Sequence, residues 1–220
     1  MYKRLLIVLI LVAIVVYSLH AYLINFVQDD AYIFFRYASN ISQGKGFVYN
    51  EGEAVYGASS PLYTLLLACF AEIGFSDFLF ISRLIGILSV ILSSVLVYKY
   101  VPLKEEVRLL CIAIILFYPR MMYSYLDGME TPLIVLLLII SIISIFQSKP
   151  FLVGVSCGLL LTTKADTIFW FGSVLIYMIL NERKWIFPVI ATTACLFLPW
   201  IVFSLRVRSE EHTSELQSPY

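Results

Sequence analysis

Long apolar runs separated by short polar connections make up most of this 220-residue chain. The runs cover residues 4–26, 61–75, 79–100, 107–123, 131–147, 150–165, 168–181 and 185–205. Several of them approach the roughly 20 apolar residues that an α-helix needs to span a bilayer. The chain is 61% hydrophobic and 14% charged, against about 45–50% and about 25% in ordinary soluble domains. The pattern therefore predicts an all-α, polytopic membrane protein.

The basic residues of the polar connections predict the orientation of the chain. Lys3 and Arg4 place the N-terminus in the cytoplasm by the positive-inside rule, so residues 28–60 are expected outside. "YKYVPLKEEVR", "QSKP" and "NERK" are then expected inside, and "LDGMET" and "TKAD" outside. This pattern requires seven crossings, with the short run 61–75, which opens with proline, lying on the outer surface. The alternative is that this run also crosses, which gives eight crossings and places "KYVPLKEEVR" outside.

The first run, residues 4–26, is too long for the core of a signal peptide and lacks a small-residue cleavage site, so we expect a retained helix. After it, "DDAYIFFRYASNISQG" predicts a short amphipathic helix lying on the membrane. Asp29 and Asp30 suit the N-terminus of a helix and its dipole, and Gly44 can end it. The apolar positions at helical spacing are Ala31, Phe34, Phe35, Ala38 and Ile41. The glycine-, asparagine- and serine-rich residues that follow predict a loop.

The acid pair Asp29–Asp30 has two interpretations: it caps a surface helix, or it takes part in chemistry. Transport pathways usually place charges within the spans, near the bilayer midplane. Here the predicted spans are almost free of charge, and Arg83 and Arg120 lie near span ends, where snorkelling explains them. Acids and bases gather instead in the segments expected outside, which favours chemistry at the outer face.

The segment "DDAYIFFRYASNISQGKGFVYNEGEAVYGASSPLYT" resembles the first external loop of class C (GT-C) membrane glycosyltransferases. It is most similar to the bacterial arabinofuranosyltransferase-like and mannosyltransferase-like branches. "DGMET", residues 127–131, is similar to the G-[LM]-E-T motif that follows the third crossing in this family. "GLLLTTKAD", residues 158–166, takes the place of its L-x-x-L-T-R-P-[DE] motif.

The resemblance implies a GT-C-type helical bundle with about seven transmembrane helices and two juxtamembrane helices in the first external loop. Such enzymes transfer a sugar from a polyprenyl-phosphate carrier to a cell-envelope glycan, lipid or protein acceptor, usually with inversion. The expected location is the inner membrane of a bacterium, with the active site on its outer face. The expected partners are this donor, the acceptor and membrane lipids, and nucleic acid is not among them.

The family's reaction assigns roles to individual residues. One carboxylate takes the proton of the attacking hydroxyl, and Asp29 is favoured over Asp30 because it matches the first acid of the family's pair. Cations stabilise the charge that develops on the departing phosphate, and the candidates for this role are Arg36, Lys45 and Lys164.

Three further acids complete the predicted substrate-binding set. Asp127 and Glu130 of "DGMET" are candidates for positioning the acceptor or a cation, and Asp166 closes the "TKAD" segment. No metal ligands and no organic cofactor are predicted, and a divalent cation is left open.

The chain departs from the family's pattern in two motifs. Tyr56 stands where the family has an acid in V-E-G-[YF]-T-S-P, and Ala165 stands for the proline of T-R-P-[DE]. Lys164 replaces the arginine of the same motif, which keeps the charge but loses the bidentate grip of a guanidinium on phosphate. These changes bear on the acceptor and on lipid-phosphate binding more than on the reaction class.

Two other functions are alternatives. A transporter or lipid flippase predicts charged or glycine-broken helices at the midplane, and Gly154 and Gly158 fit that pattern, although such spacing usually reflects helix packing. A non-enzymatic membrane assembly protein predicts that the acids of the first loop are dispensable.

The C-terminal residues differ in character from the rest of the chain. "RSEEHTSELQS", residues 208–218, is polar, lacks a helical apolar period and resembles the translation of a short-read sequencing adapter. We therefore expect residues 1–207 to be a truncated catalytic module and 208–220 to be an artefactual or disordered tail. Without the tail His20 is the only histidine, which argues against histidine catalysis and zinc binding. The four cysteines lie far apart within apolar runs, as buried small hydrophobic residues do.

Overall fold

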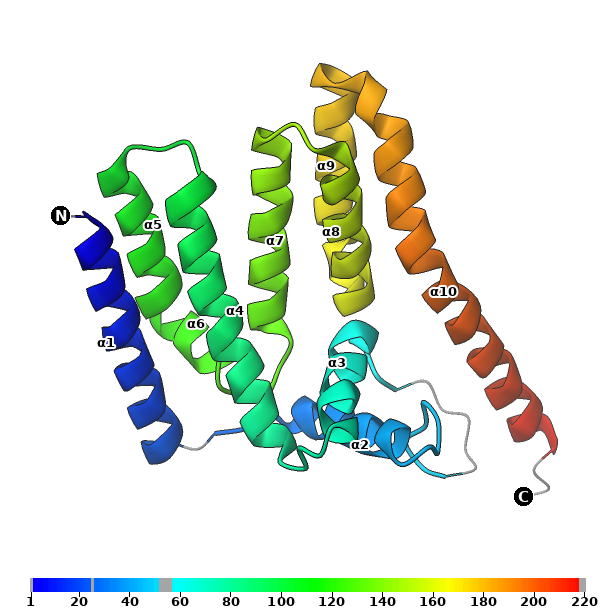
Figure 1. Cartoon of the computed structure of the whole chain (residues 1–220). Helices are drawn as coiled ribbons and strands as arrows, with labels where there is room; N and C mark the ends of the chain where they lie inside the picture. Colours follow the sequence, from blue (N-terminus) through cyan, green and yellow to red (C-terminus); the bar gives the residue numbers. More distant parts are fainter. Residues whose placement is uncertain (1, 25, 52–56, 218–220) are drawn as a thin grey trace. The chain divides into compact units, whose positions relative to one another are not determined.

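The computed structural model describes residues 2–24, 26–51 and 57–217, with side chains as far as Val207. Among these residues the only regular secondary structure is helical, with no β-strand, and loops join the helices (Figure 1). The α-helices are α1 (Tyr2–Leu23), α2 (Asp29–Ser42), α3 (Pro61–Glu72), α4 (Phe78–Tyr100), α5 (Glu105–Phe117), α6 (Pro119–Ser124), α7 (Thr131–Phe146), α8 (Pro150–Thr163), α9 (Ile168–Asn181) and α10 (Ile186–Gln217). Short 3₁₀ helices, η1 (Ala165–Thr167) and η2 (Arg183–Trp185), precede α9 and α10.

Three described helical segments are long and apolar enough to cross a membrane by length and composition: Tyr2–Leu23, Phe78–Tyr100 and Arg183–Val207. The segments Pro61–Glu72, Thr131–Phe146, Pro150–Thr163 and Ala165–Asn181 are apolar but shorter. This agrees with the coarse prediction of a helical membrane protein, and seven crossings stay a prediction.

The run 107–123 is divided where the sequence predicts one element. Helix α5 ends at Phe117 and α6 begins at Pro119. Proline has no N–H to continue a helix and is favoured at the first position of a new one. At the other end of the chain, α10 continues to Gln217, past the predicted end of the native sequence at Val207. That the tail does not pack against the helices stays a prediction.

The helices form two compact units, each built from two separate stretches of chain. Unit 1 contains residues 1–31 and 79–149, and unit 2 contains residues 32–78 and 150–220. The predicted module 1–207 therefore consists of two parts.

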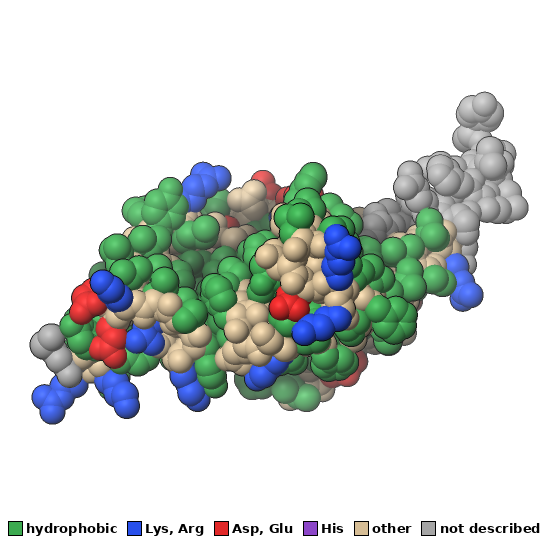
Figure 2. Space-filling view, turned by 90° about the horizontal axis from the view of Figure 1, so that it is seen from above, with side chains coloured by type: hydrophobic (Ala, Val, Ile, Leu, Met, Phe, Trp, Pro, Cys, Tyr) green, Lys and Arg blue, Asp and Glu red, His purple; other side chains and the backbone are tan. Residues whose placement is uncertain are grey.

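In unit 1, α1, α4, α5 and α7 run roughly parallel, so that the unit has two distinct ends (Figure 1). At one end, Tyr2 Oη donates a hydrogen bond to Glu106 Oε1 over 2.6 Å, which places the start of α1 beside the start of α5. Figure 2 looks onto this end and shows several lysine and arginine side chains there. The other end holds residues 26–30, the start of α4 and the α6–α7 connection.

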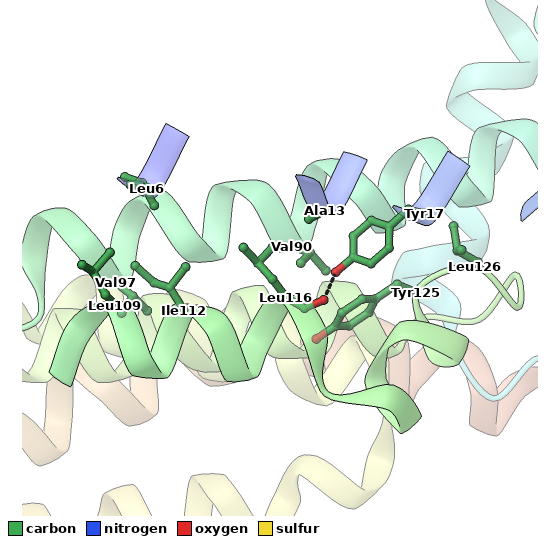
Figure 3. Packing of buried hydrophobic residues seen from close by; sticks show 10 residues of the cluster. All are labelled: Leu6, Ala13, Tyr17, Val90, Val97, Leu109, Ile112, Leu116, Tyr125 and Leu126. Atoms are coloured by element: carbon green, nitrogen blue, oxygen red, sulfur yellow. Dashed lines mark hydrogen bonds between the residues drawn. The ribbon is translucent and has the colours of Figure 1, made fainter. Parts of the chain in front are cut away.

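The core of unit 1 joins α1 to α4 and α5 (Figure 3). Its buried side chains are Leu6, Ala13, Tyr17, Val90, Val97, Leu109, Ile112, Leu116, Tyr125 and Leu126. Because α5 stops at Phe117, the carbonyl groups of its last turn lack partners within the helix. Tyr17 Oη donates to Leu116 O over 2.5 Å, and Tyr125 Oη donates to Ile115 O over 2.9 Å. These two phenols stabilise the break in the helix that positions α6.

In unit 2, α8 lies close against α10 because Gly154 and Gly158 carry no side chain. A Cβ atom at Gly158 would lie 2.9 Å from Leu196 Cβ, and one at Gly154 would overlap Thr192 Oγ1. Thr193 Oγ1 also donates to Gly154 O over 3.0 Å. The two glycines therefore serve helix packing.

Replacing Gly154 by alanine should lower the thermal unfolding midpoint of the detergent-solubilised protein. The new methyl group collides with α10, and overpacking of this kind costs about 1–3 kcal/mol. Gly172→Ala is the matched control, because a Cβ atom there meets nothing within 4 Å and alanine favours the helix. An equal midpoint in the two variants would contradict the observed packing of α8 on α10.

Helix α2 confirms the amphipathic helix predicted from the sequence. Its first turn contains Asp29 and Asp30, both exposed, and Gly44 adopts a φ of 73° just after its end. Its buried face carries Ala31, Phe34, Phe35, Tyr37, Ala38 and Asn40. The rings of Phe34 and Tyr63 pack edge-on at 5.8 Å, which brings α2 against α3 in unit 2. The loop that joins α1 to α4 thus contains two helices.

Candidate functional site

A cavity of about 460 Å³ opens in unit 1. It is lined by Phe26, Gln28, Arg120, Tyr123, Ser124 and Asp127. Its volume lies within the range of roughly 300–1,000 Å³ that small-molecule sites occupy. Five of the six lining side chains carry a polar group, so the cavity suits a polar ligand.

Helix α6 supplies one wall of the cavity. Because α6 begins at Pro119, the side chains of Arg120, Tyr123 and Ser124 follow the i, i+3, i+4 spacing and share one helical face. The Tyr123 ring also contacts the ring of His20 edge-on, with centroids 4.8 Å apart. The wall is thereby held against the last turns of α1.

The segment before α2 forms a second wall and is attached to the α6–α7 connection. Gln28 N–H donates to Asp127 O over 2.9 Å. From α4, Arg83 Nε donates to Leu126 O over 3.1 Å and Nη2 to Phe26 O over 3.5 Å. Arg83 therefore joins both segments, where the sequence suggested only a snorkelling charge.

Asp127 is the carboxylate that lines this cavity. Its Oδ1 accepts the Met129 N–H over 3.0 Å in a turn where Gly128 has a φ of 90°. Burial, together with a smaller effect of the Glu130 charge, raises the pKa of Asp127 to about 6, although the hydrogen bond from the Met129 N–H acts in the opposite direction. A carboxyl group with this pKa changes its charge close to physiological pH.

The other predicted acids of unit 1 surround the cavity without lining it. Asp29 and Asp30 follow Gln28 directly in the chain and are exposed in the first turn of α2. Glu130 is fully buried next to the start of α7. The structure thus brings the "QDD" and "DGMET" segments together through one backbone hydrogen bond.

The predicted cations Arg36 and Lys45 belong to unit 2 and hold its loop. Arg36 Nε donates to Tyr49 O over 3.1 Å, and Lys45 Nζ lies 3.1 Å from Glu51 Oε2. Asn40 Nδ2 donates to the carbonyl groups of Val48 and Tyr49 over 2.8 and 2.9 Å. These contacts give Arg36 and Lys45 a structural role in the loop.

The remaining predicted residues of unit 2 follow α8. Lys164 is half-buried just after α8 ends, and Asp166 is exposed in η1. Nearby, an apolar cavity of about 320 Å³ is lined by Pro61, Leu62, Leu65, Leu159, Thr162, Leu196, Pro199 and Trp200. Tyr56, which departs from the family's pattern, lies outside the described residues.

Sequence reasoning missed Gln28, Arg120, Tyr123 and Ser124 as cavity residues. A signal was present, because Pro119 predicts a helix start just before Arg120, and "LDGMET" follows soon after. Within the described ranges no three histidine, cysteine, aspartate or glutamate side chains group closely enough to hold a metal ion. The arrangement can accept a proton at Asp127 and bind an anion at Arg120.

Comparisons with known proteins give no family for this chain: no family model matches it, and no curated protein and no solved structure is significantly similar to it.

Proposed function

We propose that this chain is a GT-C glycosyltransferase that moves a sugar from a polyprenyl-phosphate carrier to a cell-envelope acceptor. The observation that carries the proposal is the hydrogen bond from Gln28 N–H to Asp127 O. It joins Gln28, the residue just before the "DDA" start of the first GT-C-like segment, to "DGMET", the second such segment in unit 1, and both Gln28 and Asp127 line one polar cavity. A transporter gives no reason for these distant segments to meet at the end of a helical unit.

The reaction is a displacement at the anomeric carbon of the sugar. The acceptor hydroxyl oxygen forms the new carbon–oxygen bond while the bond to the carrier phosphate breaks and the phosphate leaves with the electron pair. Asp29 takes the hydroxyl proton as the new bond forms, with Asp30 as the alternative base. Attack opposite the leaving group inverts the anomeric centre.

The surrounding residues position the two substrates. Asp127 accepts a hydrogen bond from the acceptor, with Glu130 as the alternative carboxylate for this role. In unit 2, Lys164 and Asp166 stay candidates for substrate binding, and the apolar cavity of that unit has the lining that a polyprenyl chain requires.

The proposed location is the outer face of the cell membrane, with the N-terminus in the cytoplasm. The hydrogen bond between Tyr2 and Glu106 supports the seven-crossing topology, which places the N-terminus and the α4–α5 connection on the same side. The eight-crossing alternative places them on opposite sides. The cavity lies at the other end of unit 1 and is then outside.

Sealed right-side-out membrane vesicles containing the longest reading frame that includes this chain should transfer radiolabelled sugar. The experiment supplies a panel of polyprenyl-phosphate sugars and a membrane-impermeant acceptor. We expect product with one donor class and none with inside-out vesicles, because the site faces outward. Equal label in vesicles that lack the protein would refute the function, and lipid movement without transfer would favour the flippase.

A further inference from the structure

Arg120 is a permanently charged side chain that lines the cavity. It is exposed on α6, and among the described residues its guanidinium makes no hydrogen bond or ion pair. By contrast, Arg36, Arg83 and Arg108 each donate to a backbone carbonyl group of the protein. The hydrogen-bonding capacity of Arg120 is therefore available to a ligand in the cavity.

The other polar groups of the cavity limit what that ligand can be. Gln28, Tyr123 and Ser124 are neutral and can donate hydrogen bonds, and Asp127 accepts them when ionised. The guanidinium presents a planar set of donors that matches two oxygens of a phosphate group. The cavity is therefore satisfied by an anionic oxygen group at Arg120 and a hydroxyl group at Asp127, and the donor phosphate and the acceptor hydroxyl are such a pair.

We propose that Arg120 binds the phosphate group of the lipid-linked donor in the cavity of unit 1. This inference rests on the proposed function and adds to it a phosphate-binding residue that the sequence did not predict. The candidates that the sequence predicted for this role, Arg36 and Lys45, contact Tyr49 O and Glu51 within unit 2. A phosphate ester on a lipid and free phosphate share the chemistry that Arg120 recognises, so the test separates them.

The test measures binding of methyl farnesyl phosphate to the full chain in dodecyl maltoside by phosphorus NMR titration. This diester carries one negative charge, like the donor, but has no sugar, so its binding does not depend on turnover. Hydrogen bonds to charged groups contribute roughly 1.5–3 kcal/mol, so Arg120→Gln should weaken binding about 10- to 100-fold. Arg120→Lys keeps the charge, so its affinity for the diester should lie between those of the wild type and Arg120→Gln.

Arg4→Gln is the matched control. Arg4 is also an exposed arginine of unit 1 without a partner among the described residues, but it does not line the cavity. This control should bind as the wild type does. Asp127→Asn should bind more tightly at pH 7.5, because it removes a negative charge beside the phosphate.

Three binding results would show that Arg120 does not bind the phosphate group. In the first, Arg120→Gln binds the diester as tightly as the wild type at an unchanged unfolding midpoint. In the second, Arg4→Gln weakens binding equally, and in the third, farnesol, which lacks phosphate, binds equally well. If inorganic phosphate binds as tightly as the diester, the lipid-linked donor is excluded as the ligand. Diester binding that requires Arg120, in a protein that transfers no sugar, would support the phosphate site and refute the enzyme. Transfer that is insensitive to Arg120→Gln would refute this site alone.

Discussion

Asp29→Asn should lower the rate of sugar transfer about 10²- to 10⁴-fold, which is the usual contribution of a general base. Asp29 directly follows Gln28, a residue of the cavity wall, and its exposed carboxylate lies in the first turn of α2. A rigid helix holds such a group at a set distance from the substrate better than a loop does. The measurement is initial transfer rate at saturating donor, together with the amount of protein in the membrane.

Two controls separate catalysis from helix stabilisation. Asparagine retains a side-chain oxygen that can cap a helix, so a purely structural role for Asp29 predicts little change. Asp30→Asn removes the same charge from the same turn and should lower the rate much less. Full activity of both single variants would contradict the catalytic role. The acid pair would then only stabilise α2 through the helix dipole, by about 0.3–1 kcal/mol for each charge.

Transfer should rise with pH through about 6 and then level off, because Asp127 must be ionised to accept a hydrogen bond from the acceptor. Burial raises the pKa of this carboxyl group to about 6, so at pH 5 the rate should be about tenfold below its plateau. The charged groups near it are Glu130 in its own turn, Arg83 on α4, which donates to Leu126 O, and Arg120 on α6, which lines the same cavity. Asp127→Asn should abolish the inflection near pH 6 and leave a lower, flatter profile.

The same group predicts a pH dependence of stability with a definite sign. Because the folded-state pKa of Asp127 lies above the ordinary value of 3.8, the folded protein holds this proton more tightly than the unfolded chain does. Its contribution to stability is present at low pH and is lost as pH rises from about 4 to about 6. The unfolding midpoint of Asp127→Asn should lack this decline, and an identical slope in both proteins would contradict the burial of this carboxyl group.

The apolar pattern predicted nearly every helix of this chain, because a continuous apolar run or a 3.6-residue period is a property of the local sequence. Helix α4 at Phe78–Tyr100 matches the run 79–100, and α7 at Thr131–Phe146 matches the run 131–147. Helix α2 was predicted from its acid pair and its apolar spacing. The sequence analysis missed the division of run 107–123 at Pro119. Hydropathy does not reveal that proline lacks the backbone N–H that would continue the helix.

The sequence predicted only part of the candidate site, because local periodicity does not show which distant segments contact each other. The sequence identified the segments that begin with Asp29–Asp30 and with Asp127 by resemblance, but it did not show that Gln28 contacts Asp127. That contact arises from the packing of α1, α4 and α5 in unit 1, with Arg83 donating to the carbonyl groups of Phe26 and Leu126.

The tertiary structure also distinguishes between arginine residues that the sequence alone does not tell apart. The Arg36 guanidinium donates to a carbonyl group of its own loop, whereas that of Arg120 makes no such contact among the described residues and lines the cavity. Whether an arginine side chain contacts protein groups or is available to a ligand depends on the groups around it. Those groups come together only when the helices pack.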